Sequence, residues 1–591
     1  MSRKFWIERR RAGLVALVAI GAIACPSGAP RVQAPSGPQS LLIAKTGDGR
    51  ANIAPVTIGD ETRDALLASQ SWTVAFPKRA TLTFGVGAHF DGVGETPGWG
   101  RFAVSLDGRE IAKETVNPRV AHDWKDTTIE LESPPAKGVI SISIRFTDKD
   151  GADLPQPSEL KLAMSDPVIH DKAGYGLKKG VIFISIDTLR RDHVSAYGYA
   201  KPTTPTLDAL AKGGVLADDA VSVSSWTLPA HLSMMTSVLP GTHGGTDMKR
   251  AFNHSVPTVA ELLKAQGVAT HAVTSHLYVS KTYGVDAGFD SMNFRQDRLA
   301  ENVANHAMDL IDRFGDRPFF IFLHFYDPHW HYAPPAETLK IFEPVPYAGK
   351  MTGNLNDFQK LRADQVKPAD LDHLHALYDG EIRYTDNEIA RLMTHLKERD
   401  VLRNTLMVVT SDHGEEFLEH GSWEHQKTLY EEVIRIPLIV SGPGVAARRE
   451  TQPVDLLDIA PTILDFLGVR MAPTMKGVSL LRAVPEHREM YGETDNTLDG
   501  SRLSFLRNGS QSWKAILRSD RVKKVVRSSE WYDLAVDPAE KTNRPPAESL
   551  RATIEARTQD TALKSRSTDV GKSVVLSAEQ REALKALGYV K

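Results

Sequence analysis

Acidic and imidazole side chains follow three apolar runs of this sequence within a few residues. The three groups are Asp187 after 181–186, Asp327-Pro328-His329-Trp330-His331 after 319–325, and Asp412-His413 after 405–409. A single aspartate at the end of a strand is usually the cap of the next helix, but three such groups exceed what caps explain. Carboxylates and imidazoles together are ligands that Zn, Mn, Mg and Ca accept, so the pattern predicts a divalent metal site.

The hydroxyl of Thr227 is the group that we expect to carry the chemistry. It precedes Pro229 by two residues, and the run 230–238 has helical character. Proline suits the first turn of a helix, where its missing N–H costs nothing. Thr227 would then stand at a helix N-terminus, whose free N–H groups bind tetrahedral anions. Alone, such a threonine is usually a helix cap, so its assignment depends on the metal-type residues elsewhere in the chain.

An alternation of strands and helices between residues 180 and 484 must position these groups. Continuous apolar runs, which suit strands buried on both faces, occur at 181–186, 269–273, 319–325, 405–409 and 436–440. Helical patterns lie between them at 206–212, 256–266, 302–314 and 370–397. This alternation predicts an α/β fold, with a mostly parallel sheet covered by helices on both faces. Ligands of such sheets bind beyond the carboxyl ends of the strands, where the polar groups stand.

Two further regions flank the α/β region. Residues 41–165 contain short alternating runs separated by turns, which predict an antiparallel β-sandwich of jelly-roll type. Residues 485–591 combine strand-like pieces at 513–517 and 522–526 with a helical pattern at 577–587. We expect this last region to form a small α+β subdomain.

The first 40 residues have the composition of an export signal and a linker. Basic residues precede the apolar stretch 12–24, which is too short to span a bilayer. Cys25 follows Ala22-Ile23-Ala24, which fits either a lipoprotein signal with a lipidated Cys25 or a plain signal peptide. We take residues 1–24 as the signal and 25–40, rich in Pro, Ser and Gly, as the linker. The mature protein is expected in the periplasm or cell envelope of a bacterium.

Composition excludes several other classes of protein. A net charge of −3, with 71 basic and 74 acidic residues, predicts no nucleic-acid-binding surface. The single cysteine excludes a disulfide framework and a thiolate metal site. A membrane-embedded headgroup transferase is disfavoured, because no apolar stretch of about 20 residues follows the signal.

Several motifs, in this order, resemble the sulfatases of the alkaline phosphatase superfamily. They are 186–193 (IDTLRRDH), 197–199 (YGY), 205–208 (PTLD), the Thr227 segment, 410–415 (TSDHGE) and 429–438 (LYEEVIRIPL). One residue departs from the family. The sulfatase motif Cys/Ser-x-Pro-x-Arg, whose first residue is oxidised to formylglycine, reads Thr227-Leu228-Pro229-Ala230-His231 here. Threonine cannot become formylglycine, whereas phosphodiesterases and headgroup transferases of the superfamily use a metal-bound threonine directly.

The resemblance also implies roles for individual residues. Its metal ligands correspond to Asp187, Thr227, Asp412 and His413. His329 and His425 stand where the family keeps groups that contact substrate oxygens or the leaving group. Asp327 and His331, together with His425, match a second metal site of the nucleotide-pyrophosphatase branch. One ion of Ca, Zn, Mn or Mg is therefore expected, with two ions as the alternative. The family arginine is replaced by His231, which leaves open which group supports the nucleophile.

The prediction is thus an exported, metal-dependent hydrolase of phosphate or phosphonate esters, with sulfate esters as secondary substrates and Thr227 as nucleophile. One alternative is a sulfatase that works without formylglycine. The other is a non-catalytic sulfatase-like protein that binds a glycan through the β-sandwich. The expected partner is a small-molecule, glycan or lipid ester, and membrane attachment would come through a lipidated Cys25.

Overall fold

The computed structural model describes most of the chain. The described residues are 39–40, 53–90, 98–120, 123–165, 167–171, 179–496, 500–508, 512–520, 525–564 and 571–586. The predicted signal sequence 1–24, Cys25 and the linker up to residue 38 lie outside them. None of the helices in the described ranges has the length and apolar character needed to cross a membrane.

Four parallel strands form the centre of the largest sheet, as the apolar runs predict. In sheet order they are β16 (Ala269–Thr274), β18 (Phe319–Phe325), β12 (Gly180–Ile186) and β19 (Thr405–Ser411). Every residue of β12, β18 and β19 is buried, as expected for strands covered on both faces. The register brings Ile186, Phe325 and Ser411 level, so the residues that follow leave the sheet at one edge.

The run 436–440 differs from its prediction as one more parallel strand. Pro437 divides it into β22 (Arg435–Ile436) and β23 (Leu438–Ser441), and β23 is antiparallel to β19. Proline has no N–H to donate to a ladder, which explains the break. The sheet is therefore parallel at its centre and mixed toward this side.

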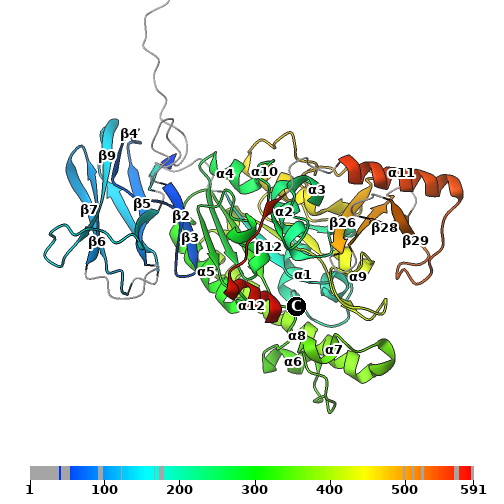
Figure 1. The fold of residues 1–591 in the computed structure, drawn as a ribbon. Helices are drawn as coiled ribbons and strands as arrows, with labels where there is room; N and C mark the ends of the chain where they lie inside the picture. The colour runs from blue at the N-terminus through cyan, green and yellow to red at the C-terminus, as the bar shows by residue number, and fades with distance from the viewer. Residues whose placement is uncertain are drawn as a thin grey trace, which may run out of the picture. The chain divides into compact units, whose positions relative to one another are not determined.

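Helices cover both faces of this sheet, which confirms the predicted α/β architecture (Figure 1). One face carries α1 (Pro205–Lys212), α5 (Ala300–Phe314) and α8 (Pro368–Glu398), and the other α2 (Thr227–Thr236), α4 (Val259–Lys264) and α10 (Ile459–Leu467). Side chains of β12 alternate between the two cores. Ile182 and Ile184 pack with the first set of helices, and Val181 and Phe183 with the second.

The predicted β-sandwich consists of two antiparallel sheets. One contains β4 (Gln70–Ala75), β9 (Lys137–Thr147), β6 (Trp99–Leu106) and β7 (Arg109–Val116). The other contains β2 (Ile53–Ile58), β3 (Glu61–Leu66), β10 (Leu160–Ser165), β5 (Ala80–Phe90), β8 (Lys125–Leu131), β11 (Val168–Asp171) and β1 (Gln39–Ser40). Trp72, Leu82 and Phe102 share one core between the sheets. Unexpectedly, β3 also pairs with β17 (Ser291–Phe294), so the sandwich and the α/β region share one continuous sheet.

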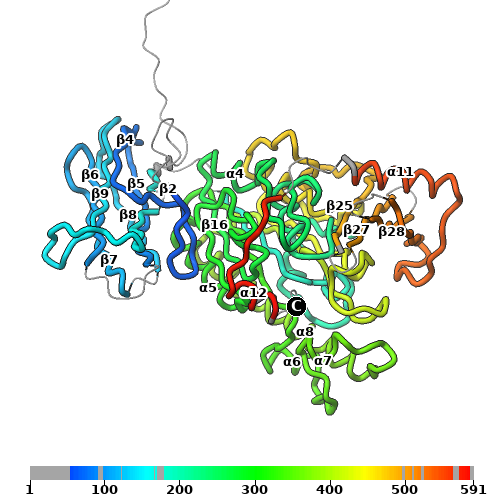
Figure 2. The backbone as a smooth tube through the Cα atoms, in the orientation of Figure 1, coloured from blue at the N-terminus to red at the C-terminus, as the bar shows by residue number. Residues whose placement is uncertain are grey.

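The C-terminal region forms an antiparallel sheet of four strands with α11 (Glu548–Lys564) against it. The strands are β26 (Met490–Asn496), β27 (Ser501–Arg507), β28 (Trp513–Asp520) and β29 (Val526–Asp533). The chain then returns to the α/β region, where β30 (Lys572–Ser573) pairs with β15 (Arg250–Ala251) ahead of α12 (Ala578–Ala586) (Figure 2). Composition did not predict this return.

A buried cation joins the C-terminal sheet to the α/β region, and its removal should destabilise the protein. Lys514 Nζ, fully buried, lies 3.0 Å from Glu431 Oε1 and 2.8 Å from Glu540 Oε1. Lys514→Met would leave buried Glu540 without its cation and Glu431 with Arg507 alone, 3.8 Å away, and breaking a buried pair in this way typically costs about 3–5 kcal/mol. Urea unfolding measures this loss. The control Arg362→Met, which breaks an exposed pair with Asp364, should leave the urea midpoint unchanged.

Candidate metal and catalytic site

The carboxyl ends of β12 and β19 bring two aspartates together. Asp187 follows β12, and its N–H donates to the carbonyl of Phe325 at 2.9 Å. Asp412 follows β19, and its Oδ1 accepts hydrogen bonds from the N–H groups of Thr188 (3.2 Å) and His413 (2.9 Å). Both aspartates and His413 are completely buried. The predicted metal ligands of these two strand ends therefore form one cluster.

The nucleophile candidate Thr227 lies beside this cluster. Its Oγ1 is 3.4 Å from His413 Nε2, and the residue is 1% exposed. Helix α2 begins at Thr227 itself rather than at the predicted residue 230. Trp226, the residue before it, has an extended backbone (φ −163°, ψ 164°), so the first helical residue is Thr227. Pro229 still falls within the first turn, where an N–H has no acceptor in the helix. The hydroxyl thus stands at the positive end of α2.

The atoms of the cluster suit a cation. Ligand atoms of Asp187, Asp412 and His413 lie within 4.8 Å of one another, with His413 Nε2 3.3 Å from Asp412 Oδ2 and 3.7 Å from Asp187 Oδ1. None of the described residues donates a hydrogen bond to either oxygen of Asp187 or to Asp412 Oδ2. Buried oxygens without donors are costly, and a divalent ion would satisfy all three. The residues present therefore fit the metal that the sequence predicts.

Electrostatics supports the same conclusion. Burial raises the pKa of Asp187 well above its usual range, and the neighbouring charge of Asp412 raises it further. Burial also acts to raise the pKa of Asp412, but His413 outweighs this effect and lowers it below the usual range. Burial acts to lower the pKa of His413, but Asp412 outweighs this effect and raises it above the usual value. His413 Nδ1 donates to the carbonyl of Gly414 at 2.9 Å, so Nε2 is the nitrogen that would offer a lone pair to a cation once it is deprotonated. A cation here would meet two carboxylates and one imidazole nitrogen.

His231 occupies the motif position of the family arginine and supports the start of α2. The completely buried ring donates from Nδ1 to the carbonyl of Thr227 at 2.8 Å and accepts at Nε2 from Ser185 Oγ at 3.0 Å. Its Nδ1 also lies 3.6 Å from Asp412 Oδ2. Burial lowers the pKa of His231 to about 3, so the ring is neutral. Thr227 is thus tied to β12 by neutral hydrogen bonds instead of an arginine charge.

The two other catalytic candidates lie beside each other, and His425 also lies next to His413. The ring centroid of His425 is 4.4 Å from that of His413 and 5.2 Å from that of His329. His425 Nδ1 is 3.2 Å from Glu415 Oε1, and His329 Nδ1 donates to the carbonyl of Trp330 at 2.8 Å. Burial lowers the pKa of both histidines, that of His329 to about 3. Both rings are therefore neutral neighbours of the metal cluster.

Asp327 and His331 do not join His425 in a second cluster. Asp327 Oδ2 accepts the N–H of Ala300 at 2.8 Å and so caps the start of α5, and burial raises its pKa to about 6. His331 Nδ1 accepts the N–H of Leu355 at 2.9 Å. Within the described ranges, the groups whose atoms could share an ion include neither residue. Spacing suggested a second metal, but in the structure Asp327 Oδ2 and His331 Nδ1 each accept a backbone N–H instead.

One other group of metal-type residues exists in the described part of the chain, formed by Glu416, His420 and Glu432. His420 contacts Glu432 Oε1 at 2.5 Å through Nδ1 and the carbonyl of Glu540 at 3.1 Å through Nε2. Glu416 accepts hydrogen bonds from the Ser422 N–H and the Thr428 hydroxyl. Contacts within the fold therefore satisfy this group without an ion.

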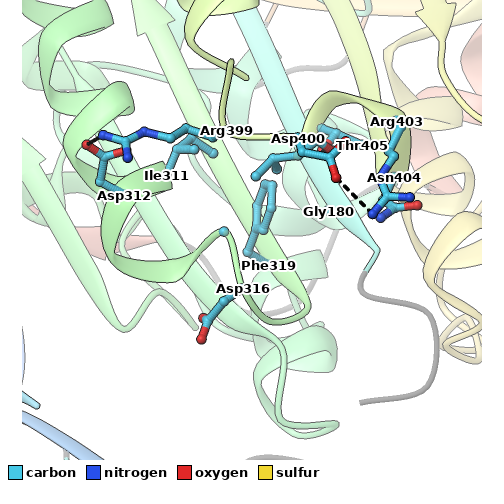
Figure 3. A pocket seen from close by; sticks show the side chains of 12 residues that line it. Gly180, Ile311, Asp312, Asp316, Phe319, Arg399, Asp400, Arg403, Asn404 and Thr405 are labelled. Atoms are coloured by element: carbon cyan, nitrogen blue, oxygen red, sulfur yellow. Dashed lines mark hydrogen bonds and ion pairs between the residues drawn. The ribbon is translucent and has the colours of Figure 1, made fainter. Parts of the chain in front are cut away.

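A cavity of about 290 Å³ lies at the opposite edge of the sheet (Figure 3). Its lining includes Gly180, Phe319 and Thr405, the first residues of β12, β18 and β19. Four of its five charged side chains pair with each other, Arg399 with Asp312 and Arg403 with Asp400, and the fifth, Asp316, pairs with Arg317 outside the lining. Nothing in this cavity resembles the chemistry at the carboxyl edge.

The sequence analysis missed two polar residues of the site, Ser185 and His324. Both lie inside runs that it treated as apolar, 181–186 and 319–325. A polar side chain in a strand buried on both faces needs a partner, and that requirement was the available signal. Ser185 bonds to His231, and His324 Nε2 lies 3.3 Å from Asp187 Oδ2.

Comparison with known protein families agrees with the resemblance. The family model described as Sulfatase matches residues 179–469. Among curated relatives, Arylsulfatase K of Mus musculus is 29% identical over 219 residues. That match covers 35% of the chain and 37% of the mouse protein, so the chain spans well under half the length of this relative.

Two solved structures share the fold over 66% of the chain. The structure of BT4656 in complex with its substrate D-glucosamine-2-N,6-O-disulfate has a TM-score of 0.57 and 20% identity, with 98% of that chain covered. The phosphonate monoester hydrolase of Agrobacterium radiobacter has a TM-score of 0.54 and 19% identity, with 97% covered. At these identities the likeness concerns the fold, and it confirms the predicted architecture.

Proposed function

Residues 179–469 belong to the sulfatase family of the alkaline phosphatase superfamily, and on this premise we propose that the protein is an exported, metal-dependent hydrolase of phosphate or phosphonate esters. The proposal depends above all on the Thr227 hydroxyl, buried at the first residue of α2 and 3.4 Å from His413 Nε2. Since threonine cannot supply formylglycine, this hydroxyl itself would attack the ester.

Four residues would hold the metal: Asp187, Asp412, His413 and Thr227. When bound, a divalent ion lowers the pKa of a coordinated hydroxyl and offsets negative charge on the transferring group. The N–H groups in the first turn of α2 have no acceptors within the helix, so they can bind the phosphoryl oxygens. His231 holds that turn against β12 through Ser185.

The proposed reaction proceeds in two displacements. Thr227 Oγ1 attacks phosphorus, and the bond from phosphorus to the leaving alcohol oxygen breaks as the Oγ1–P bond forms. His425, neutral because burial lowers its pKa, takes the Oγ1 proton and passes it to the leaving oxygen, with His329 beside it. Water then attacks the phosphothreonine and the P–Oγ1 bond breaks. A proton from the water returns to Oγ1, which restores the Thr227 hydroxyl, and the acid product leaves.

Replacing His425 should lower kcat/KM by an amount that depends on the leaving group of the substrate. For an alkyl phosphodiester, His425→Ala is expected to lower kcat/KM by about 10²–10⁴, the usual contribution of a positioned proton carrier. For a p-nitrophenyl ester the loss should be smaller, because nitrophenolate leaves without a proton and only the acceptance of the Oγ1 proton is lost. Steady-state kinetics on both esters provides the comparison. Equal losses on the two esters would argue against delivery of a proton from His425 to the leaving oxygen.

Hydrolysis of sulfate esters without formylglycine is the second candidate, and it is favoured by relatives such as the mouse arylsulfatase. The two candidate functions are distinguished by the turnover of four substrates by the same metal-loaded protein: an aryl sulfate, a phosphate monoester, a phosphodiester and a phosphonate monoester. A much larger kcat/KM for the sulfate would reject our proposal. Binding of polysaccharide by a protein that holds no stoichiometric metal would instead favour a non-catalytic glycan-binding protein.

Export and lipidation at Cys25 form part of the proposal and rest on the N-terminal sequence. Cell fractionation tests export, and mass spectrometry of the mature N-terminus tests the lipid.

A further inference from the structure

The turn that follows β12 contains a strained residue beside the proposed metal ligands. The N–H of Leu189 donates to the carbonyl of Ile186 at 3.4 Å, so residues 186–189 form a tight turn. The third residue of this turn, Thr188, has a positive φ of 55°. Turns with positive φ at this position normally have glycine or asparagine there, and a β-branched residue is a rare exception. Such strain persists only where the surrounding structure enforces it.

The side chain of Thr188 does not account for this conformation. Thr188 is completely buried, and its Oγ1 forms no hydrogen bond with any of the described residues. Its backbone groups, in contrast, are both bonded. The N–H donates to Asp412 Oδ1 at 3.2 Å, and the carbonyl accepts the hydroxyl of Tyr378 at 2.7 Å. The strained conformation is therefore held through the backbone, by one side chain at each peptide group of Thr188.

Tyr378 lies within α8 and bonds to the turn at two points. Its hydroxyl donates to the carbonyl of Thr188 and accepts the N–H of Arg190 at 2.9 Å. A carbonyl can only accept, so this arrangement uses the single phenolic proton and one lone pair. The completely buried ring packs with its centroid 5.0 Å from that of His193 and 5.3 Å from that of Phe417. A tightly packed ring thus holds the hydroxyl against the turn.

The N–H of Thr188 in turn orients one of the proposed metal ligands. Together with the N–H of His413, it bonds to Oδ1 of Asp412 and leaves Oδ2, 3.3 Å from His413 Nε2, to the ion. A relaxed Thr188 with negative φ would rotate the peptide group that carries this N–H. The carboxylate would then lose one of the two donors that fix its orientation.

We propose that Tyr378 is a positioning residue of the metal site, whose hydroxyl holds Thr188 in the strained turn so that Thr188 orients Asp412 for the ion. This inference rests on the metal site of the proposed function and adds to it a residue of α8 that acts through the backbone of the turn. It has a specific consequence. Glycine adopts positive φ without strain, so a glycine at position 188 should make the Tyr378 hydroxyl dispensable.

The first test needs no metal and follows hydrogen–deuterium exchange of the peptide 187–191 in the metal-stripped, full-length protein. We expect slow exchange in the wild type and at least about tenfold faster exchange in Tyr378→Phe, which keeps the ring and removes the hydroxyl. Fast exchange in the wild type would overturn the inference whether or not the variant folds. Equal exchange in the wild type and in Tyr378→Phe would also overturn it.

The matched control for this test is Tyr384→Phe. It removes another hydroxyl of α8, one that accepts a backbone N–H, that of Glu301, at 3.2 Å. The peptide 187–191 should exchange in this variant as in the wild type. Faster exchange to the same extent in both variants would assign the effect to α8 in general and overturn the role of Tyr378.

The second test measures metal affinity by calorimetric titration of Mn²⁺ into the metal-stripped proteins. Tyr378→Phe should bind Mn²⁺ about 10- to 100-fold more weakly than the wild type, the usual cost of losing a group that orients a metal ligand. In the Thr188→Gly background, the same substitution should cost less than about threefold, because glycine removes the strain. An equal loss in the two backgrounds would reveal a merely structural role and overturn the inference. A wild-type protein that binds none of Mn²⁺, Zn²⁺ and Ca²⁺ would reject the proposed function itself, so the two failures are distinguishable.

Discussion

Thr227→Ala is expected to abolish ester hydrolysis while the protein keeps its metal. The substitution removes the attacking oxygen and leaves the ligand atoms of Asp187, Asp412 and His413 in place. Removal of a nucleophile in such a unit lowers kcat by on the order of 10⁴–10⁶. Turnover of a phosphonate monoester and metal content by elemental analysis, measured on the same preparation, test both halves of the expectation.

Two variants of the same helix provide the controls. Thr227→Ser keeps a hydroxyl at the first residue of α2 and should retain measurable turnover. Thr236→Ala removes a buried hydroxyl at the other end of α2, one that donates only to the carbonyl of Leu232 at 2.6 Å, and should stay within about threefold of the wild type. Turnover by Thr227→Ala within tenfold of the wild type would reject the threonine mechanism.

Asp412→Asn is expected to remove both the metal and the activity. The asparagine oxygen can keep the two hydrogen bonds that Asp412 Oδ1 accepts from Thr188 and His413, so the backbone should remain in place. Its NH₂ group replaces Oδ2, the oxygen that no described residue satisfies. The loss of one charge and one ligand should lower kcat/KM by at least about 10³, since a catalytic metal supplies several kcal/mol.

The same substitution should have the opposite effect on the stability of the metal-free protein. Burial raises the pKa of Asp187, and the charge of Asp412 raises it further, which reflects repulsion between two buried carboxylates. An amide in place of one carboxylate removes that repulsion and can donate a hydrogen bond to the other. With a chelator present, Asp412→Asn should therefore melt at a higher temperature than the wild type.

Without the chelator the wild type should melt at a higher temperature than Asp412→Asn, because only the wild type gains stability from bound metal. Thermal unfolding of both proteins with and without chelator measures this reversal of the two melting temperatures. A wild-type melting temperature that does not respond to the chelator would contradict the presence of a metal at Asp187 and Asp412.

Most of the central fold followed from local sequence. Strands buried on both faces need apolar side chains at every position, and the runs around Val181, Phe319 and Thr405 became β12, β18 and β19. The helical pattern at 370–397 became α8 with nearly the same bounds. Pairings between distant segments could not be read in this way. The joining of β3 to β17, the reversed direction of β23 and the return of β30 to β15 depend on edges that meet only in the folded chain.

The candidate site could likewise be predicted only in part from local sequence. The sequence by itself determined which residue types stand at the strand ends and at the start of α2, because motif order and apolar runs are local properties. The tertiary structure decided how each was used: Asp187, Asp412, His413 and Thr227 came together, whereas Asp327 became a helix cap and His331 an acceptor for the N–H of Leu355. It also brought in His324 from inside an apolar run. The physical reason is that a ligand is defined by an unsatisfied lone pair, and whether a lone pair is satisfied depends on neighbours from other segments of the chain.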